Sequence, residues 1–189
     1  LAREIRKKNP DVNILLTTST ISSYKLMKNK KNNFYLFYSP VDIDFIIKKF
    51  LGLWNPDIVI FFESEIWPNI IHNLHVLNKQ FIICNGRISE NSYRNWRKVP
   101  VFRETFFSKV SICFSQDKQS MYRFRKLGVK SVKMIGNIKF LANSLSINKV
   151  DFNKFKIQIR GKKTITFFSS HPGEDEIFIR VANKLKDKL

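Results

Sequence analysis

The chain has 189 residues, 43% of them hydrophobic, which is enough for one large packed domain and excludes a disordered chain. Its 34 Lys and Arg residues against 15 Asp and Glu residues give a formal net charge of +19, which attracts anionic partners. Every apolar run is shorter than the ~20 residues that a transmembrane helix requires, and no signal peptide is visible.

Short β-branched and aromatic runs alternate with longer amphipathic stretches. The first segment, LAREIRKKNP, is typical of the last turns of a helix that stops at Pro10, so we expect the native chain to begin upstream of Leu1. Strands are predicted at 13–18, 34–38, 58–62, 81–84, 111–114, 132–135 and 164–169. Helices are predicted at 20–28, 42–52, 67–77, 99–108, 116–127, 151–159 and 174–187. The last of these patterns is cut by the end of the sequence, so we expect a piece of a longer protein.

The alternation of strands and helices predicts an α/β fold. Continuous apolar strands are typical of a parallel sheet that is covered on both faces. Strand–helix repetition at this spacing predicts a right-handed, doubly wound domain over residues 1–140. A polar, Lys- and Asn-rich linker is predicted at 141–150. Residues 151–189 are then predicted to be the start of a second α/β domain.

Polar residues follow several predicted strands at their carboxyl ends, where doubly wound sheets bind ligands. They are Glu63-Ser64-Glu65, Asn85-Gly86-Arg87, Gly136-Asn137-Ile138-Lys139 and, in the second unit, Ser170-His171-Pro172-Gly173-Glu174. Each cluster alone is ordinary, but their convergence on one edge predicts a site. The sequence contains no Walker-type loop, GxGxxG motif, metal-ligand cluster or nucleophile elbow.

The two glutamates after the third strand have different predicted roles. Glu63 is either a site carboxylate or a solvated turn residue, and we favour the site. Glu65 precedes Pro68 in the first turn of a predicted helix, so we expect it to interact with the helix N-terminus. Arg87 suits a phosphate or carboxylate ligand or an ion pair with Glu63, and an exposed loop residue is an equally good interpretation.

The remaining candidates carry weaker signals. Lys139 is one lysine among many. His171 and Gly173 lie at a helix start, where backbone N–H groups can bind an anion, or they form a polar loop in which Glu174 favours the helix N-terminus. Cys84 and Cys113 lie inside apolar strands and are predicted to be buried thiols, which fits a reducing cytoplasm.

The positive charge has two interpretations. Lysines scattered over solvated faces, in a composition typical of an AT-rich genome, explain most of it without a partner. The densest basic run, KNKKNN at 28–33, lies in an expected loop and lacks the interleaved aromatic residues of a nucleic-acid module. We therefore expect no nucleic-acid partner, and a basic nucleic-acid-binding protein stays the weakest alternative.

Five segments together carry a family resemblance. FFESEIWPNII, IICNGRIS, FSQDKQSMYRFRKLGV, MIGNIKF and SSHPGEDE closely resemble, in order and spacing, the bacterial 3-deoxy-D-manno-octulosonic acid (Kdo) transferases. The resemblance implies a GT-B fold of two Rossmann-like domains. It also implies inverting transfer of Kdo from CMP-Kdo to lipid IVA in lipopolysaccharide core synthesis, without a metal or other cofactor. The location implied is the anionic cytoplasmic face of the bacterial inner membrane.

The resemblance also implies roles for individual residues. Glu63 and Lys139 match the family's transition-state stabilisers. Their physical task is to steady an oxocarbenium-like sugar while negative charge builds on the departing phosphate. The residues whose positions match substrate-binding segments are Arg87, Asn137, Ser170, His171, Gly173 and Glu174.

The chain departs from the family pattern in three places. The family's membrane anchor and its S-x-GE segment, which supplies the general base, do not precede Leu1. Its main CMP-binding segments come after the position of Leu189, and Leu141 stands where the family often has Asp. We therefore expect this fragment to be inactive alone. The alternative is a non-catalytic remnant of a split or decaying gene.

Overall fold

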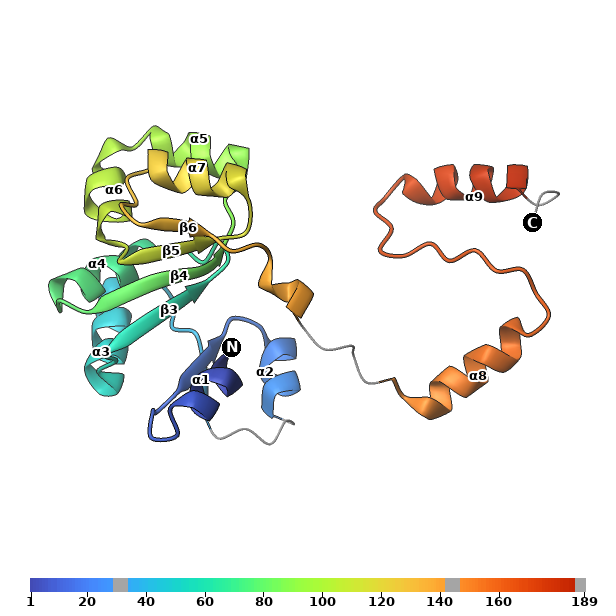
Figure 1. The fold of residues 1–189 in the computed structure, drawn as a ribbon, viewed down its shortest axis with the longest axis horizontal. Coiled ribbons are helices and arrows are strands. Elements are labelled where there is room, and N and C mark those ends of the chain that lie inside the picture. The colour runs from blue at the N-terminus through green and yellow to red at the C-terminus, as the bar shows by residue number, and fades with distance from the viewer. Residues whose placement is uncertain (29–33, 142–146, 186–189) are drawn as a thin grey trace. The chain divides into compact units, whose positions relative to one another are not determined.

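The computed structural model describes residues 1–28, 34–141 and 147–185. Its internal contacts divide the chain into two units, Leu1–Leu141 and Ala142–Leu189, both drawn in Figure 1. Most of the basic run at 28–33 and the first half of the predicted linker lie outside the described residues. The assignment of the second unit as the start of another domain stays a prediction.

The first unit alternates strands and helices, as predicted. Its strands are β1 (Leu15–Thr18), β2 (Tyr35–Tyr38), β3 (Ile58–Phe62), β4 (Gln80–Gly86), β5 (Ile112–Ser115) and β6 (Val132–Met134). Its α-helices are α1 (Ala2–Lys8), α2 (Ile21–Lys28), α3 (Asp44–Trp54), α4 (Pro68–Val76), α5 (Glu90–Arg97), α6 (Pro100–Thr105) and α7 (Lys118–Lys126). Two 3₁₀ turns, η1 (Phe107–Lys109) and η2 (Ile138–Leu141), complete it.

All the strand pairs are parallel, which confirms the α/β class. β3, β4, β5 and β6 lie side by side in sequence order, and β1 pairs with β2 in a separate sheet (Figure 1). A tight turn can join only antiparallel strands, because the second strand of a parallel pair must start at the same end as the first. Each neighbouring pair of parallel strands is therefore joined by a helical crossover. The carboxyl ends of β3 to β6 therefore meet at one edge of the four-stranded sheet.

One face of the four-stranded sheet carries the core. Phe61, Ile83, Cys113 and Val132 face one another in register across the four strands, and all are buried. On the opposite face of the sheet, Ile58 is 58% exposed and Ile60 is 39% exposed, whereas Cys84 is buried. Successive side chains of a strand point to opposite faces, so the expectation of a strand covered on both faces is wrong for the first part of β3.

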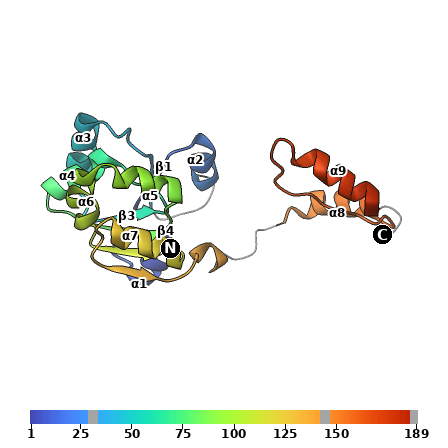
Figure 2. The same ribbon diagram turned by 90° about the horizontal axis from the view of Figure 1, so that it is seen from above.

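Helices α3 and α4 pack against each other beside the sheet (Figure 2). Ile47 and Leu51 of α3 and Leu74 of α4 are almost completely buried. The N-terminus of α4 is capped by Asp42, a residue remote in sequence. The two Asp42 carboxylate oxygens accept from the backbone N–H groups of Asn69 and Ile70, at 3.0 and 2.9 Å. Asp42 thus satisfies two of the donors that a helix start leaves unpaired.

Strand β4 contains a bulge that determines where its end points. Ile83 pairs with Cys113 and Gly86 pairs with Ser115, so β4 contains one residue more than β5 between these two pairs. Asn85, inside the bulge, has φ 55°, in the left-handed region. The next residue is Gly86, and a Cβ added there would lie 2.9 Å from the Cys113 Sγ. The Asn-Gly pair thus matches the local backbone and the close packing of β4 on β5.

Both cysteines are free and buried, as predicted. Burial raises the pKa of the Cys113 thiol to about 12, and it also raises the pKa of Cys84. Neutral thiols are the favoured form inside an apolar core, since burial penalises the charged thiolate. Both cysteines therefore act as packing residues.

Two elements differ from the sequence-based expectations. Helix α5 was not predicted because its sequence is short and mostly polar, with only Tyr93 and Trp96 on its apolar face. Ser89 caps this helix by accepting from the Ser92 N–H at 3.1 Å. The strand predicted at 164–169 is wrong. This segment is extended but pairs with no strand among the described residues, and a lone strand leaves its backbone groups unpaired.

The second unit contains helices α8 (Lys149–Ile159) and α9 (Glu174–Leu185). Neither helix buries a residue. The Phe167 ring stacks on the Phe178 ring of α9, with centroids 4.7 Å apart. A side-chain contact thus joins the predicted strand segment to the following helix.

We predict that Asp42→Ala destabilises the first unit by roughly 1–2 kcal/mol, because it removes the cap of α4. The control is Asp57→Ala, which removes an equal charge from an exposed position. Urea unfolding followed by circular dichroism measures both. Equal midpoints for the two variants would contradict the assigned cap.

We predict opposite effects for two Gly→Ala changes. Gly86→Ala should destabilise by roughly 1–3 kcal/mol, because the new methyl meets Cys113, Ile83 and Phe124 at 2.9–3.1 Å. Gly52→Ala, within α3, meets nothing within 4 Å and should stabilise by roughly 0.5–1 kcal/mol. Thermal unfolding of both variants checks the sign. A stable Gly86→Ala variant would show that β4 and β5 are less tightly packed.

Candidate functional site

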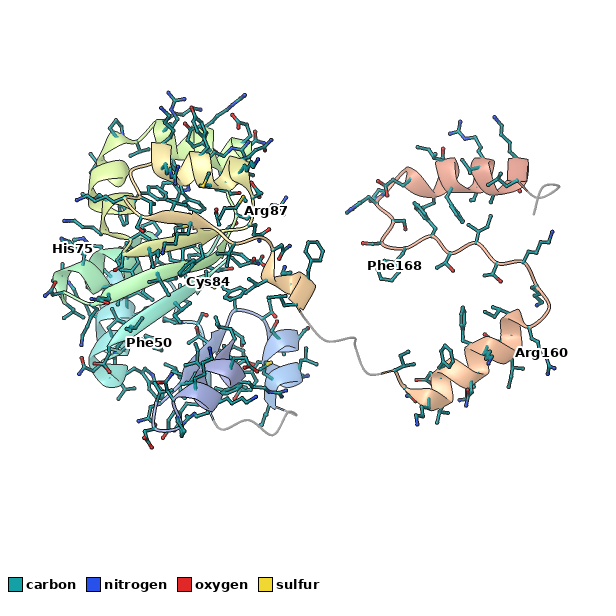
Figure 3. The ribbon with its side chains drawn as sticks, in the orientation of Figure 1. Phe50, His75, Cys84, Arg87, Arg160 and Phe168 are labelled. Carbon is teal, nitrogen blue, oxygen red and sulfur yellow. The ribbon has the colours of Figure 1, made fainter. Side chains whose placement is uncertain are left out.

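The polar clusters of the first unit gather at the carboxyl edge of the four-stranded sheet. Glu63 directly follows β3, Gln116 follows β5, and Lys139 lies in η2 after β6. Arg87 comes directly after β4, whose Cys84 is also labelled in Figure 3. Parallel strands bring their carboxyl ends to the same edge, which is where ligands bind in such sheets.

Glu63 and Lys139 form an ion pair at this edge. The Lys139 Nζ lies 2.5 Å from the Glu63 Oε1, and both side chains remain accessible to solvent. The structure therefore brings together the two residues that were expected to act together. Their catalytic role stays a prediction.

The backbone at Glu63 is unusual. Its φ is 63°, in the left-handed region that residues with a Cβ seldom adopt. Its N–H still donates to the Cys84 carbonyl at 2.9 Å, so the strand pairing continues up to the turn. Such conformations cost of order 1 kcal/mol and cluster at functional sites. The left-handed turn adds support to a site role for Glu63.

Neighbouring hydrogen bonds shape the loop that carries Lys139. The Lys139 N–H donates to the Asn137 Oδ1 at 3.0 Å, so the Asn137 side chain has a local structural partner. The Ile138 N–H donates to the Oδ1 of buried Asn85 at 3.1 Å. The sequence placed Asn85 in one of the predicted polar clusters but indicated no role of its own for this residue. The Asn-Gly pair at the end of a strand was the available signal.

Arg87 lies at the same edge but does not pair with Glu63. Its carbonyl accepts from the Ser64 hydroxyl at 2.5 Å, which links the turns after β3 and β4. Its guanidinium is exposed and makes no ion pair within the described residues. It lines a pocket of about 540 Å³ with Lys118 and Arg123, between the N-terminal turns of α5 and α7.

Two acidic side chains, Glu90 and Asp117, line this pocket together with its cations and offset part of its charge. Glu90 accepts from Arg94 at 2.9 Å and from Arg123 at 2.7 Å. These partners lower the pKa of the Glu90 carboxyl, chiefly through the hydrogen bond from Arg94. Glu90 is therefore ionised and already paired, while the Asp117 carboxylate accepts from the Ser120 N–H at 2.7 Å. Arg87 and Lys118 line the same pocket and form no ion pair within the described residues.

Glu65 bonds to the side chain of Trp67, the N-cap residue of α4, and does not cap the backbone N–H groups of this helix. Its Oε2 accepts from the Trp67 indole N–H at 2.6 Å. The distant Asp42 carboxylate already occupies the donors at the start of α4, and the Asn69 side chain donates back to the Asp42 carbonyl at 2.6 Å. Asn69 of the Trp-Pro-Asn segment thus has a structural role.

The predicted site residues of the second unit lie in an exposed turn before α9. The His171 N–H donates to the Glu174 Oε2 at 3.0 Å, and Gly173 has φ 90°. Ser170 is exposed beside them. This arrangement matches the interpretation of a polar loop closed by Glu174. A role in binding substrate stays a prediction for these four residues.

The described ranges contain neither a candidate metal site nor a candidate membrane-spanning helix. No group of three or more His, Cys, Asp or Glu residues in them is placed to hold a metal ion. Within the same ranges, no helix combines the length and the apolarity needed to cross a bilayer.

Comparisons with known proteins identify the family of this chain. The family model described as 3-Deoxy-D-manno-octulosonic-acid transferase (kdotransferase) matches residues 1–142. Relatives bearing the name 3-deoxy-D-manno-octulosonic acid transferase include one from Rickettsia conorii, 31% identical over 100% of this chain and 41% of its own length. Another, from Haemophilus influenzae, is 30% identical over 95% of this chain and 43% of its own length.

A probable mitochondrial 3-deoxy-D-manno-octulosonic acid transferase from Arabidopsis thaliana is 27% identical over 97% of this chain and 43% of its own length. The chain thus spans about two fifths of the length of the curated relatives it matches. Since the family model covers most of the chain, the chain belongs to the 3-deoxy-D-manno-octulosonic-acid (Kdo) transferase family.

Proposed function

We propose that this chain forms part of a glycosyltransferase that moves Kdo from CMP-Kdo to lipid IVA in lipopolysaccharide core synthesis, with inversion and without a metal. Family membership supports the transferred sugar. The observation that carries the proposal is the Glu63–Lys139 ion pair at the carboxyl edge of the sheet. The donor, the acceptor and the stereochemistry are inferences from the family resemblance.

The chemistry requires positive charge that is already in place. As the bond from the Kdo anomeric carbon to the phosphate oxygen breaks, the bonding electron pair leaves with the CMP phosphate. The sugar then becomes oxocarbenium-like. The acceptor hydroxyl forms the new bond on the opposite face and gives its proton to a general base, the role that the family resemblance assigns to the glutamate of the S-x-GE segment. The Lys139 ammonium supplies charge for the phosphate or the Kdo carboxylate, and Glu63 orients that ammonium and favours the cationic sugar.

The acceptor and the membrane are anionic, and the chain has a charge of +19. We propose that its basic residues face the phosphates of lipid IVA and the cytoplasmic surface of the inner membrane. The pocket at Arg87 and Lys118 suits a phosphate or carboxylate group. Ser170, His171, Gly173 and Glu174 would contact substrate from the second unit.

The test uses a chimeric enzyme, because the chain spans about two fifths of its relatives. Residues 1–189 replace the matching segment of the Rickettsia conorii relative, and transfer from CMP-Kdo to lipid IVA is measured. We expect transfer by the chimera, and a fall in kcat of about a hundredfold, ~3 kcal/mol in barrier, for Glu63→Gln or Lys139→Met.

Each substitution has a matched control. Glu65→Gln removes a carboxylate two residues from Glu63, and Lys133→Met removes an exposed ammonium from β6. Both controls should keep kcat within about twofold, as expected for surface changes away from the site. Full turnover by the Glu63→Gln chimera would refute the proposed role, and circular dichroism verifies that every variant is folded.

A further inference from the structure

We propose that Asn85 is a positioning residue for this reaction: it holds the backbone of the Lys139 loop so that the ammonium reaches Glu63. The inference rests on the proposed roles of Glu63 and Lys139. Asn85 touches neither charged side chain in the structure's hydrogen bonds and ion pairs. It acts through the peptide group before Lys139.

The β4 bulge directs the Asn85 side chain out of the regular strand pattern. The β4 segment from Ile83 to Gly86 lies opposite the β5 segment from Cys113 to Ser115, which is one residue shorter. A bulge of this kind bends the strand and turns a side chain in a new direction. Here the side chain points toward a segment 53 residues later in the chain, where the Asn85 Oδ1 accepts from the Ile138 N–H at 3.1 Å.

The backbone of Asn85 is held on its other side. The Asn85 carbonyl accepts from the Gln116 side-chain amide at 3.0 Å, and the Gly86 carbonyl accepts from the Gln116 N–H at 2.9 Å. Asn85 has no exposed surface. A fully buried side chain on a hydrogen-bonded backbone is suited to positioning a loop that is itself accessible to solvent.

Two successive residues of β4 hold the two members of the ion pair. The Cys84 carbonyl accepts from the Glu63 N–H at 2.9 Å, and the Asn85 side chain accepts from the Ile138 N–H. The backbones that carry Glu63 and Lys139 are therefore both tied to the end of one strand. These two hydrogen bonds explain how two solvent-accessible side chains, distant in sequence, are held close enough to form an ion pair.

The residue type fits this task. Asn tolerates a left-handed backbone and carries an acceptor, whereas Gly lacks the acceptor and Leu lacks both properties. Asp would bring a charge into a fully buried position. The Asn85 Nδ2 is buried and has no hydrogen-bond partner within the described residues, which costs stability. Asn85 is thus a poor choice for stability alone.

Amide hydrogen exchange tests the contact in the chain itself. In the unsubstituted protein, the Ile138 N–H should exchange about tenfold more slowly than in an unstructured peptide. Asn85→Gly keeps the left-handed backbone accessible and removes the acceptor, so this protection should be lost. The Cys113 and Ile135 amides, which donate to backbone carbonyls, should keep theirs.

The matched control is Asn78→Gly, at an exposed turn where φ is 52°. It makes the same change of backbone preference away from the edge and should leave Ile138 protected. An unprotected Ile138 amide in the unsubstituted protein would overturn the proposal. This measurement is available even if Asn85→Gly does not fold. Protection of Ile138 that survives in folded Asn85→Gly would overturn it equally.

The chimera separates positioning from a general structural role. Asn85→Gly should lower kcat about tenfold with little change in KM, and it should have no further effect when Lys139 is already Met. Equal losses in both backgrounds would refute action through Lys139. A chimera that transfers no Kdo would count against the proposed function, while the exchange result would still decide whether Asn85 holds the loop.

Discussion

The register of the four parallel strands is the constraint on which the rest of the first unit depends. Phe61, Ile83, Cys113 and Val132 face one another across the strands, and this buried row fixes how far each strand extends beyond its neighbours. A shift of one residue would turn these side chains to the opposite face. The same register therefore aligns the strand ends, and the polar residues that follow them meet at one edge.

The ion pair at this edge contributes little to folding. Exposed pairs are worth about 0–1 kcal/mol, because water screens the charges and ordering the side chains costs entropy. Glu63 also occupies a left-handed backbone conformation, and the Asn85 Nδ2 is buried without a partner within the described residues. Both features lower the stability of the fold, and both lie at the edge where the two opposite charges meet. This pattern is typical of functional sites and uncommon in parts that serve stability alone.

The elements predicted correctly were those whose signal is local. Continuous apolar runs predicted β1 to β6 with shifts of one or two residues. Helix α5 was missed because the segment is short and strongly polar overall, and only its few apolar residues, such as buried Tyr93, contact the core. The apolar run at 164–169 has the composition of a strand, but composition cannot provide the neighbour that a strand needs. Glu65 was misassigned because the donors of α4 are satisfied by Asp42, which is remote in sequence.

By itself, the sequence determined the α/β class, the parallel character of the strands, the buried thiols and the family motifs that contain Glu63, Arg87 and Lys139. These features depend on residue type and short-range order, which a sequence displays directly. Only the tertiary structure decided that Lys139, and not Arg87, pairs with Glu63. It alone also showed that Asn85 accepts a hydrogen bond from the loop that carries Lys139. The physical reason is that these contacts depend on strand register and on a one-residue bulge. Both are set by packing between segments far apart in the chain.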